Sequence, residues 1–310
     1  MSNYVLGIDC GGTFVKVALI DRDGNISERT SFETEVNQGT ELFIHSFVSM
    51  IEQYKQKICA VGIAFAAPLD PEKGTIEEPP NFPKAFHNFP LVKKLEEKCH
   101  IPVFLENDAN LAALGEYWKG QGKNSPVLVV ITLGTGVGGG IIIHGEIWNG
   151  SSGIAGEVGH IPVYDSGPIC GCGNIGCLET YASSTAVLRM AKEIQKGSPL
   201  CDLKKFSAED VYKSALSGDT IAKEIFTKVG LALGRGIVNI CHVIGPDKII
   251  LTGGGSGAWD LFAPAMKETV AKMCFKKEKS ILQILPSDLQ GNSGILGAGY
   301  LAWKKLGQAK

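Results

Sequence analysis

The feature that most constrains this chain is a layout that occurs twice, about 120 residues apart. Residues 4–24 read as a short apolar strand, a glycine-rich turn, a second strand and a polar turn, and residues 127–146 repeat that order. Strands and helical stretches alternate after each copy. We therefore predict an α/β protein with two lobes, each built on one copy of a duplicated βββαβα-like unit.

Periodicity and turn residues predict the remaining elements, with residues 68–90, rich in proline, expected to form a loop. We assign residues 1–118 and 295–310 to a smaller lobe and residues 119–294 to a larger one. Further strands are predicted over 58–64, 102–105 and 248–251, and helices over 42–57, 91–98, 109–118, 180–196, 208–217, 219–243, 260–274 and 294–305.

Composition narrows the class of protein. The chain has 310 residues, 44% of them hydrophobic, and a formal charge of −2, which argues against nucleic acid as the main partner because phosphate neutralisation needs a basic face. No apolar run approaches the length of a membrane span. The N-terminus MSNYVLGIDCGG does not resemble a signal peptide, so we expect a cytoplasmic protein with mostly reduced cysteines.

The glycine-rich turns are the first candidates for ligand binding. Asp9-Cys10-Gly11-Gly12-Thr13 offers backbone N–H groups and a hydroxyl to an anion, and Asp9 offers a carboxylate to Mg²⁺. Gly134–Gly140 holds more glycine than a hairpin requires, and it lacks the ending of a P-loop. Two such turns would clamp a polyphosphate from both sides, although the first also fits an ordinary hairpin.

A polar cluster follows the strand at 102–105. Glu106-Asn107-Asp108 stands between a strand and a helix, where α/β folds place ligands. Asp108 would either cap the helix or accept the proton of an attacking hydroxyl, as phosphoryl transfer requires. Asn107 can bridge a sugar hydroxyl through its amide.

Three of the nine cysteines lie within eight residues, and a histidine precedes them. His160, Cys170, Cys172 and Cys177 match a closed Cys₃His zinc site, which leaves no open position for water and is therefore predicted to be structural. The alternative is three unrelated thiols in a loop. Glu157 and Glu179 flank the cluster and would accept hydrogen bonds from sugar hydroxyls, or else lie in solvent or beside the metal ligands.

Other candidates are weaker. Gly253-Gly254-Gly255, after a strand, would seat a nucleoside against the backbone or form a plain loop, with Gly254 and Gly255 as the expected contacts. His242 is read as an isolated histidine, and the charged run at 276–279 as a solvated turn.

Together these motifs resemble the ROK family of bacterial sugar kinases and repressors, within the actin/hexokinase-like ATPase fold. The likeness covers nearly the whole chain, and its zinc segment, residues 157–179, is the most specific part. It implies an ATP-dependent hexose kinase in which Asp108 takes a proton from a sugar hydroxyl, usually the 6-OH. It also implies a homodimer. The sugar contacts that it implies are Asn81, Asn107, Asp108, Glu157, His160 and Glu179.

The resemblance assigns the remaining motifs to cofactors. Asp9 would help to place Mg²⁺, and zinc would be held by His160, Cys170, Cys172 and Cys177. The contacts with the ATP phosphates would be Gly11, Gly12 and Thr13 on one side and Gly134, Thr135 and Gly136 on the other.

Departures from the family pattern leave the sugar open. Phe14 stands where the family often has Lys, and Ala66-Ala67-Pro68 replaces a common Pro-Gly. Residues 156–163 (GEVGHIPV) are most like the allose-kinase branch, so D-allose or a glucose-like sugar is expected. N-acetylmannosamine, N-acetylglucosamine and β-glucosides are alternative substrates.

Two other functions compete with a kinase. A non-catalytic sugar sensor of the same fold would bind sugar without consuming ATP, and the intact Asp108 argues against it. A zinc-dependent hydrolase needs an open metal position, which the closed ligand set does not offer. Repressors of the family carry a DNA-binding segment ahead of the first motif, whereas only eight residues precede Asp9 here.

Overall fold

The computed structural model describes residues 3–12, 14–34, 38–79, 83–194, 198 and 206–307. The chain forms two compact units, each described by itself below. Unit 1 contains residues 1–125, 140–155 and 288–310, and unit 2 contains residues 126–139 and 156–287. This division differs from the expected lobes, which placed residues 119–294 together. Within the described ranges, no helix has the length and apolar character needed to cross a bilayer.

The first sheet has the order β3-β2-β1-β4-β7. β1 runs antiparallel to β2, which runs antiparallel to β3, while β1, β4 and β7 run parallel. The carboxyl ends of these three parallel strands therefore meet at one edge, where polar ligands bind in open α/β sheets. The strands are β1 (Tyr4–Cys10), β2 (Phe14–Asp21), β3 (Ile26–Glu33), β4 (Ile58–Phe65) and β7 (Val103–Asn107).

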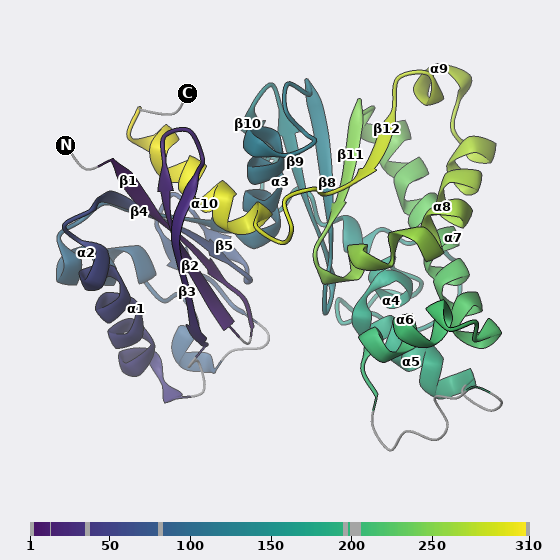
Figure 1. The fold of residues 1–310 in the computed structure, drawn as a ribbon, viewed down its shortest axis with the longest axis horizontal. Helices are drawn as coiled ribbons and strands as arrows, with labels where there is room; N and C mark the ends of the chain where they lie inside the picture. Colours follow the sequence, from purple (N-terminus) through teal and green to yellow (C-terminus); the bar gives the residue numbers. More distant parts are fainter. Residues whose placement is uncertain are drawn as a thin grey trace. The chain divides into compact units, whose positions relative to one another are not determined.

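The second sheet repeats this arrangement with the order β10-β9-β8-β11-β12, in which β11 runs parallel to both β8 and β12. If the strands of each sheet are numbered one to five along the chain, both sheets have the spatial order three, two, one, four, five (Figure 1). The duplicated layout predicted from the two glycine-rich segments is thus confirmed in the strand order. The strands are β8 (Val127–Leu133), β9 (Val137–Ile143), β10 (Glu146–Ile147), β11 (Lys248–Thr252) and β12 (Gln283–Pro286).

The helices follow the predicted periodicity closely. The predicted helix at 180–196 begins with two separate segments, and the predicted loop at 68–90 contains the hairpin of β5 (Leu69–Asp70) and β6 (Thr75–Ile76). Short 3₁₀ turns lie at Lys84–Phe86, Val158–His160 and Gly254–Ala258. The helices are α1 (Thr40–Tyr54), α2 (Leu91–Cys99), α3 (Asp108–Lys119), α4 (Glu179–Ala182), α5 (Ser184–Ile194), α6 (Ala208–Leu216), α7 (Thr220–Ile244), α8 (Trp259–Met273), α9 (Lys276–Lys279) and α10 (Ser293–Lys305).

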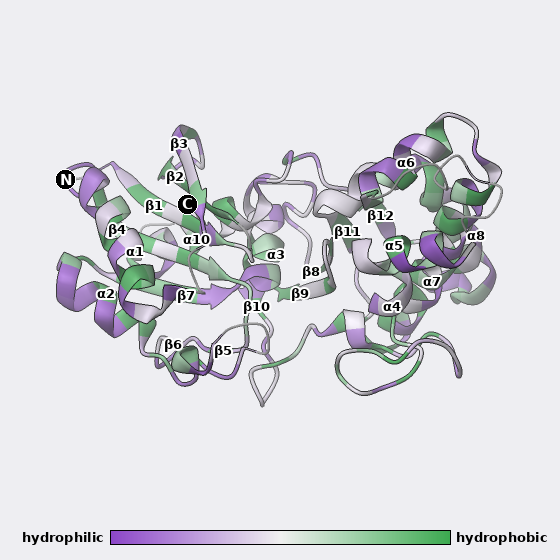
Figure 2. Cartoon of the chain, turned by 90° about the horizontal axis from the view of Figure 1, so that it is seen from below, coloured by the Kyte–Doolittle hydropathy of each residue, from purple (hydrophilic) through white to green (hydrophobic). Residues whose placement is uncertain are grey.

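Unit 1 has apolar cores on both faces of its sheet. Phe43 and Phe47 of α1 pack against Phe86, and the rings of Phe43 and Phe86 meet edge to face at 5.2 Å. The other core contains Trp118 and Trp303, from α3 and α10. Each fully buried aromatic side chain contributes about 1.5–3 kcal/mol through burial. Figure 2 shows that most of α2 is hydrophilic whereas β1 is apolar, which agrees with the many exposed residues of α2 and the buried residues of β1.

Helices α3 and α10 pack so closely that their backbones are in contact. A Cβ added to Gly297 would lie 1.8 Å from the carbonyl oxygen of Leu111, and one added to Gly115 would lie 2.0 Å from that of Ser293. Any side chain at either position would push the helices apart. The carboxylate of Glu116 also accepts a hydrogen bond from the Ser293 hydroxyl at 2.7 Å, so the pair is held by polar as well as backbone contact.

Candidate active site

The first glycine turn follows the carboxyl end of β1 in unit 1. The Gly11 N–H donates to the carbonyl of Phe14 at 3.1 Å, closing a tight turn. A Cβ on Gly12 would meet no atom within 4 Å, and neither Gly11 nor Gly12 has a positive φ. Internal packing therefore does not demand glycine at position 12, and the backbone there is open to a ligand.

Asp9 lies at the same end of β1. Burial raises the pKa of its carboxyl group, and the positive charge of Lys16 opposes that shift. A divalent cation beside a half-buried carboxylate would favour its charged form. Asp9 therefore has the chemistry of the Mg²⁺ ligand that the sequence predicts.

Asp108 occupies the first turn of α3, directly after β7. The helix is capped by Asn107, whose Oδ1 accepts hydrogen bonds from the N–H groups of Ala109 (2.9 Å) and Asn110 (3.2 Å). The alternative that Asp108 serves as the N-cap is therefore wrong. Because the cap uses the oxygen of Asn107, its amide nitrogen is the atom that would donate to a sugar hydroxyl.

The carboxylates of Asp9 and Asp108 act on the same buried thiol. Burial first, and then the negative charges of Asp9 and Asp108, raise the pKa of Cys10 well above its ordinary value. Asp9 lies at the end of β1 and Asp108 directly follows β7. Strand β4 lies between these two strands in the sheet. The carboxyl edge of this sheet thus gathers one carboxylate suited to a metal ion and another suited to a proton.

A buried polar network joins the end of β7 to the start of α3. Glu106 is only 7% exposed, and its Oε1 accepts from the Asn107 N–H at 2.8 Å and from Asn110 Nδ2 at 3.1 Å. Asn110 Nδ2 also donates to Oδ1 of Asn149 at 3.0 Å. We did not predict roles for Asn110 and Asn149, since nothing in the sequence connects the loop at 148–150 with the start of α3.

The second glycine turn, in unit 2, is held in place by hydrogen bonds that its carbonyl oxygens accept. Ser184 N–H donates to the carbonyl of Gly134 at 2.8 Å, and the Thr185 hydroxyl donates to that of Thr135 at 2.8 Å. Within the turn, the Gly134 N–H donates to the carbonyl of Gly136. A Cβ on Gly134 would meet nothing within 4 Å, so this turn, like the first, has an open face at a glycine of ordinary φ.

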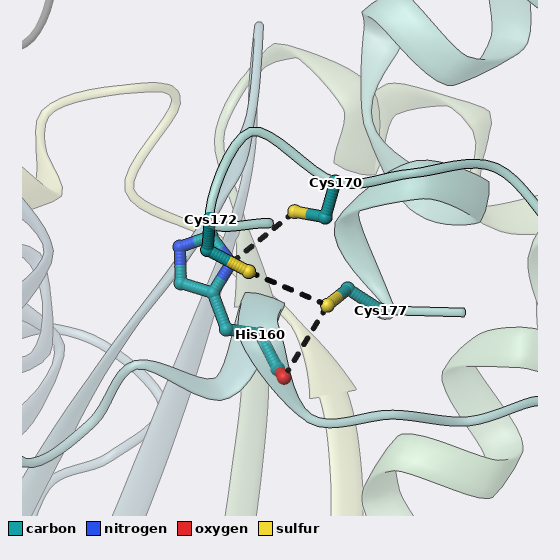
Figure 3. A group of neighbouring side chains, drawn as sticks. All are labelled: His160, Cys170, Cys172 and Cys177. Carbon is teal, nitrogen blue, oxygen red and sulfur yellow. Dashed lines mark hydrogen bonds between the residues drawn. The ribbon is translucent and has the colours of Figure 1, made fainter. Parts of the chain in front are cut away.

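The predicted metal ligands gather in unit 2. The ligand atoms of His160, Cys170, Cys172 and Cys177 all lie within 4.8 Å of one another, and Figure 3 shows them pointing toward a common centre. Cys172 Sγ lies 3.7 Å from Cys177 Sγ, and Cys170 Sγ lies 3.4 Å from His160 Nδ1. Sulfur ligands at about 2.3 Å around a tetrahedral zinc ion stand about 3.8 Å apart, so the donor set fits that ion.

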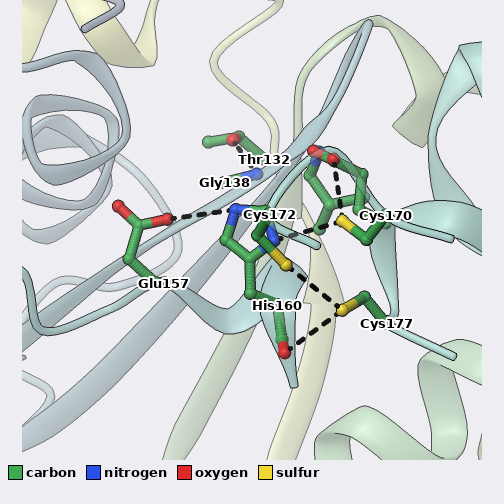
Figure 4. A network of polar contacts seen from close by, with 9 residues as sticks. Thr132, Gly138, Glu157, His160, Cys170, Cys172 and Cys177 are labelled. Atoms are coloured by element: carbon green, nitrogen blue, oxygen red, sulfur yellow. Dashed lines mark hydrogen bonds and ion pairs between the residues drawn. The ribbon is translucent and has the colours of Figure 1, made fainter. Parts of the chain in front are cut away.

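The two glutamates that flank the cluster have different surroundings. Glu157 is exposed, and its Oε2 lies 3.8 Å from Nε2 of His160, on the ring edge away from the sulfurs (Figure 4). Glu179 Oε2 accepts from the Val137 N–H at 3.0 Å, at the end of the second glycine turn. Its Oε1 accepts from the Cys170 thiol at 3.7 Å. Glu179 therefore connects the cysteine cluster to the glycine turn.

A cavity of about 410 Å³ lies in unit 2 beside Gly254 and Gly255. A Cβ on Gly254 would meet nothing within 4 Å, whereas Gly253 has a φ of 87° and packs against Leu133, so the fold itself requires glycine there. Sequence reasoning found the glycines but missed the side chains that line the cavity, because α5, α6 and α7 supply them separately. Those side chains include Val187, Tyr212, Lys213, Phe226 and Val229.

Two predicted site residues, Thr13 and Asn81, lie outside the described residues. The other predicted residues fall into two groups. Unit 1 brings together Asp9, Gly11, Gly12, Asn107 and Asp108, and unit 2 brings together Gly134, Thr135, Gly136, Glu157, His160, Cys170, Cys172, Cys177 and Glu179, with Gly254 and Gly255 at its cavity.

Known proteins resemble the chain over almost its full length. The family model described as "ROK family" matches residues 5–305. A glucokinase of Thermotoga maritima is 35% identical over 316 residues, covering 98% of each chain. A ROK family glucokinase from Streptomyces griseus, solved in complex with glucose and AMPPNP, has a TM-score of 0.84 at 30% identity and covers 97% of this chain and 99% of its own.

Repressors are also among the relatives. A xylose repressor of Caldicellulosiruptor bescii is 27% identical over 94% of this chain and 76% of its own. The family model spans nearly the whole chain. The two glucokinases named above match this chain almost end to end, and both are more identical to it than this repressor is. The chain therefore belongs to the ROK family and is a sugar kinase.

Proposed function

We propose that the enzyme transfers the γ-phosphoryl group of ATP to the 6-hydroxyl of glucose or a glucose-like hexose. The observation that carries this proposal is the placement of Asp108 and Asp9 on one carboxyl edge, close enough to Cys10 for both charges to act on it. Phosphoryl transfer needs a carboxylate for the acceptor's proton and a second site for the metal that accompanies ATP. The identity with glucokinases supports glucose as the acceptor.

In the proposed reaction, the Asp108 carboxylate accepts the proton of the sugar hydroxyl as its oxygen attacks the γ-phosphorus. The new bond joins that oxygen to phosphorus, and the bond from phosphorus to the β,γ-bridging oxygen breaks, so that ADP leaves. General-base help of this kind contributes about 10²–10⁴-fold. The buried Glu106, bonded to the Asn107 N–H and Asn110, fixes the start of α3 and with it the carboxylate.

We assign the nucleotide to three of the open glycine positions, Gly12, Gly134 and Gly254. Gly12 and Gly134 offer backbone to the phosphates, together with Gly11, Thr13, Thr135 and Gly136. The cavity beside Gly254 and Gly255 takes the adenosine, since Val187, Phe226 and Tyr212 line it with apolar and aromatic surface. Asp9 would hold Mg²⁺ or its waters, and the ion would neutralise the charge that develops on the phosphates.

We propose that His160, Cys170, Cys172 and Cys177 hold a structural zinc ion. When bound, it supplies cross-links and no chemical step, because four protein ligands close its coordination sphere. The cluster fixes His160 with Nδ1 toward the sulfurs and Nε2 toward Glu157. That orientation leaves Nε2 and the exposed Glu157 available to a sugar hydroxyl. Asn81, Asn107 and Glu179 remain further proposed sugar contacts.

A coupled ADP-release assay across sugars tests the proposal. We expect the highest kcat/KM for glucose, with allose, mannose, N-acetylglucosamine and N-acetylmannosamine below it. A higher value for allose would instead support the branch to which residues 156–163 are similar. Sugar binding measured by calorimetry without ADP release from any sugar would overturn the catalytic proposal in favour of a sensor.

The family resemblance also supports a homodimer that works in the cytoplasm with sugar and ATP as its partners. The formal charge of −2 offers no general attraction for nucleic acid. Light scattering coupled to size exclusion measures the mass directly, and a monomer near 33.0 kDa would contradict the dimer.

A further inference from the structure

A second group of metal-ligating side chains lies in unit 2, at the C-terminal end of the long helix α7. His242 stands in the last turn of α7, Cys274 follows the end of α8, and Glu278 belongs to α9. Cys241 precedes His242 on α7. The group shares no residue with the cysteine cluster, the glycine turns or the adenosine cavity, so the proposed kinase reaction leaves it without a role.

The ligand atoms of the group already converge. One nitrogen of His242, the sulfur of Cys274 and one carboxylate oxygen of Glu278 lie within 4.8 Å of one another. His242 Nε2 lies 3.5 Å from Glu278 Oε2. Around a tetrahedral zinc ion, nitrogen and oxygen ligands at about 2.0–2.1 Å stand about 3.4 Å apart. The observed separation matches that geometry.

The surroundings hold two of these ligands in place. Glu278 Oε2 accepts a hydrogen bond from the Phe275 N–H at 2.8 Å, which fixes its carboxylate against the start of α9. The Phe275 ring packs on the His242 imidazole, with centroids 5.0 Å apart. Ligands that are held before the metal arrives lose less entropy on binding.

Sulfur lies at the buried side of the group and solvent at the other. Cys274 and Cys241 are buried, and their thiols are hydrogen-bonded to each other, while His242 is exposed. A cavity of about 420 Å³ borders the group, lined by Cys241, Phe275, Glu278 and Ile281 among others. An ion would therefore have an entry path and an open coordination position.

We propose that His242, Cys274 and Glu278 form a second site for a thiophilic divalent cation of the Zn²⁺ class, with its fourth position open to water or to the Cys241 sulfur. One thiolate, one imidazole and one carboxylate select such an ion over Mg²⁺ or Ca²⁺, which prefer oxygen ligands. The bound ion would join the end of α7 to the turn between α8 and α9. The site is weaker than the Cys₃His cluster, because it has three protein ligands and only one sulfur.

Cobalt titration of the full-length protein tests the site, with Co²⁺ alone as the probe. Metal per chain is counted after equilibrium dialysis, and thiolate-to-cobalt absorbance reports sulfur ligation. We expect the wild-type protein to bind one equivalent more than His242→Ala and Cys274→Ser, or to bind that equivalent at least tenfold more tightly. Cys172→Ser, which changes only the first cluster, is expected to keep the second equivalent. His45→Ala, on the exposed face of α1, is the matched control and is expected to bind like the wild type.

His242 is exposed, so His242→Ala tests the proposal even if Cys274→Ser does not fold. Equal stoichiometry and affinity in the wild-type protein and His242→Ala would overturn it. So would a Cys241–Cys274 disulfide found by peptide mapping of the purified protein, because it would consume the sulfur ligand. Loss of the first equivalent in Cys172→Ser, with the second retained, separates this result from failure of the structural zinc proposed above.

Discussion

The two sheets share a strand order but carry different chemistry. Unit 1 presents carboxylates and amides at the ends of β1 and β7, whereas unit 2 holds a cysteine cluster, a glycine turn fixed by hydrogen bonds and an apolar cavity. A duplicated backbone therefore does not dictate a duplicated function. It supplies equivalent strand ends, and the loops that follow them decide which chemical groups each copy carries.

The strongest test of this division is Asp108→Asn in unit 1. The amide cannot accept the sugar's proton, so kcat is expected to fall by about 10²–10⁴-fold or more while sugar binding survives. A coupled assay and calorimetry measure the two quantities. Asp23→Asn, at an exposed turn of the same unit, is the control and should be fully active. Unchanged turnover in Asp108→Asn would remove proton transfer from unit 1.

Cys172→Ser in unit 2 should affect binding before chemistry. Loss of one of four ligands is expected to remove the zinc and to raise the KM for sugar about tenfold or more, since His160 and Glu157 lose their support. Metal analysis and steady-state kinetics are the measurements. Cys59→Ser, beside β1, tests whether any cysteine change has this effect. A fall in kcat alone, with KM unchanged, would contradict a structural role for the metal.

Gly254→Val sharpens the assignment of the nucleotide to unit 2. A Cβ there would meet no protein atom within 4 Å, so we expect the fold to tolerate the substitution. We expect the KM for ATP to rise about tenfold because the side chain enters the proposed nucleotide space, while the KM for sugar and the melting temperature stay close to those of the wild type. Equal rises in both KM values would indicate a general distortion and would count against the nucleotide assignment.

The smallest expected effect concerns the N-cap of α7. Asp219 accepts hydrogen bonds from the Ile221 and Ala222 N–H groups and from the hydroxyls of Ser198 and Ser214. Burial acts to raise the pKa of Asp219, but these hydrogen bonds outweigh it and lower the pKa below its ordinary 3.8. Asp219→Ala is expected to lower the stability of unit 2 by about 0.5–2 kcal/mol at neutral pH.

The pH dependence of this effect follows from the direction of the shift. A lowered folded-state pKa contributes stability above pH 3.8, and that contribution is lost as the pH falls through the lowered value. The difference in melting temperature between the wild type and Asp219→Ala should therefore shrink below about pH 4. A difference that persists at the lowest pH at which unit 2 remains folded would show that the carboxylate charge is not responsible.

Most of the architecture could be predicted because its signals are local. Apolar strands that end in glycine located β1 and β8, and helical periodicity located α7 and α8. Among the edge strands, β3 and β12 escaped prediction for a physical reason. β3 exposes most of its residues over Ile26–Glu33, and β12 spans only Gln283–Pro286, so neither has the apolar character of a central strand.

The two metal-ligating groups show the same limit at the level of sites. Cys170, Cys172 and Cys177 lie close in sequence, so their spacing alone predicts a cluster. His242 belongs to α7, Cys274 follows α8 and Glu278 belongs to α9, so the packing of α7 against α8 is needed to bring them together. The N-cap of α3 shows a finer limit, since Asn107 and Asp108 are adjacent and chemically equivalent as caps.

The contact between α3 and α10 has a consequence for how the chain is made. Most of unit 1 precedes unit 2 along the chain, yet α10, whose Gly297 touches α3, follows all of unit 2. At roughly 5–20 residues per second, a ribosome needs on the order of ten seconds or more to make the intervening segment. During that interval the surface that α10 covers in the folded chain is exposed. Trp118, which packs in the core with α10, is then accessible to chaperones and can associate wrongly with neighbouring nascent chains.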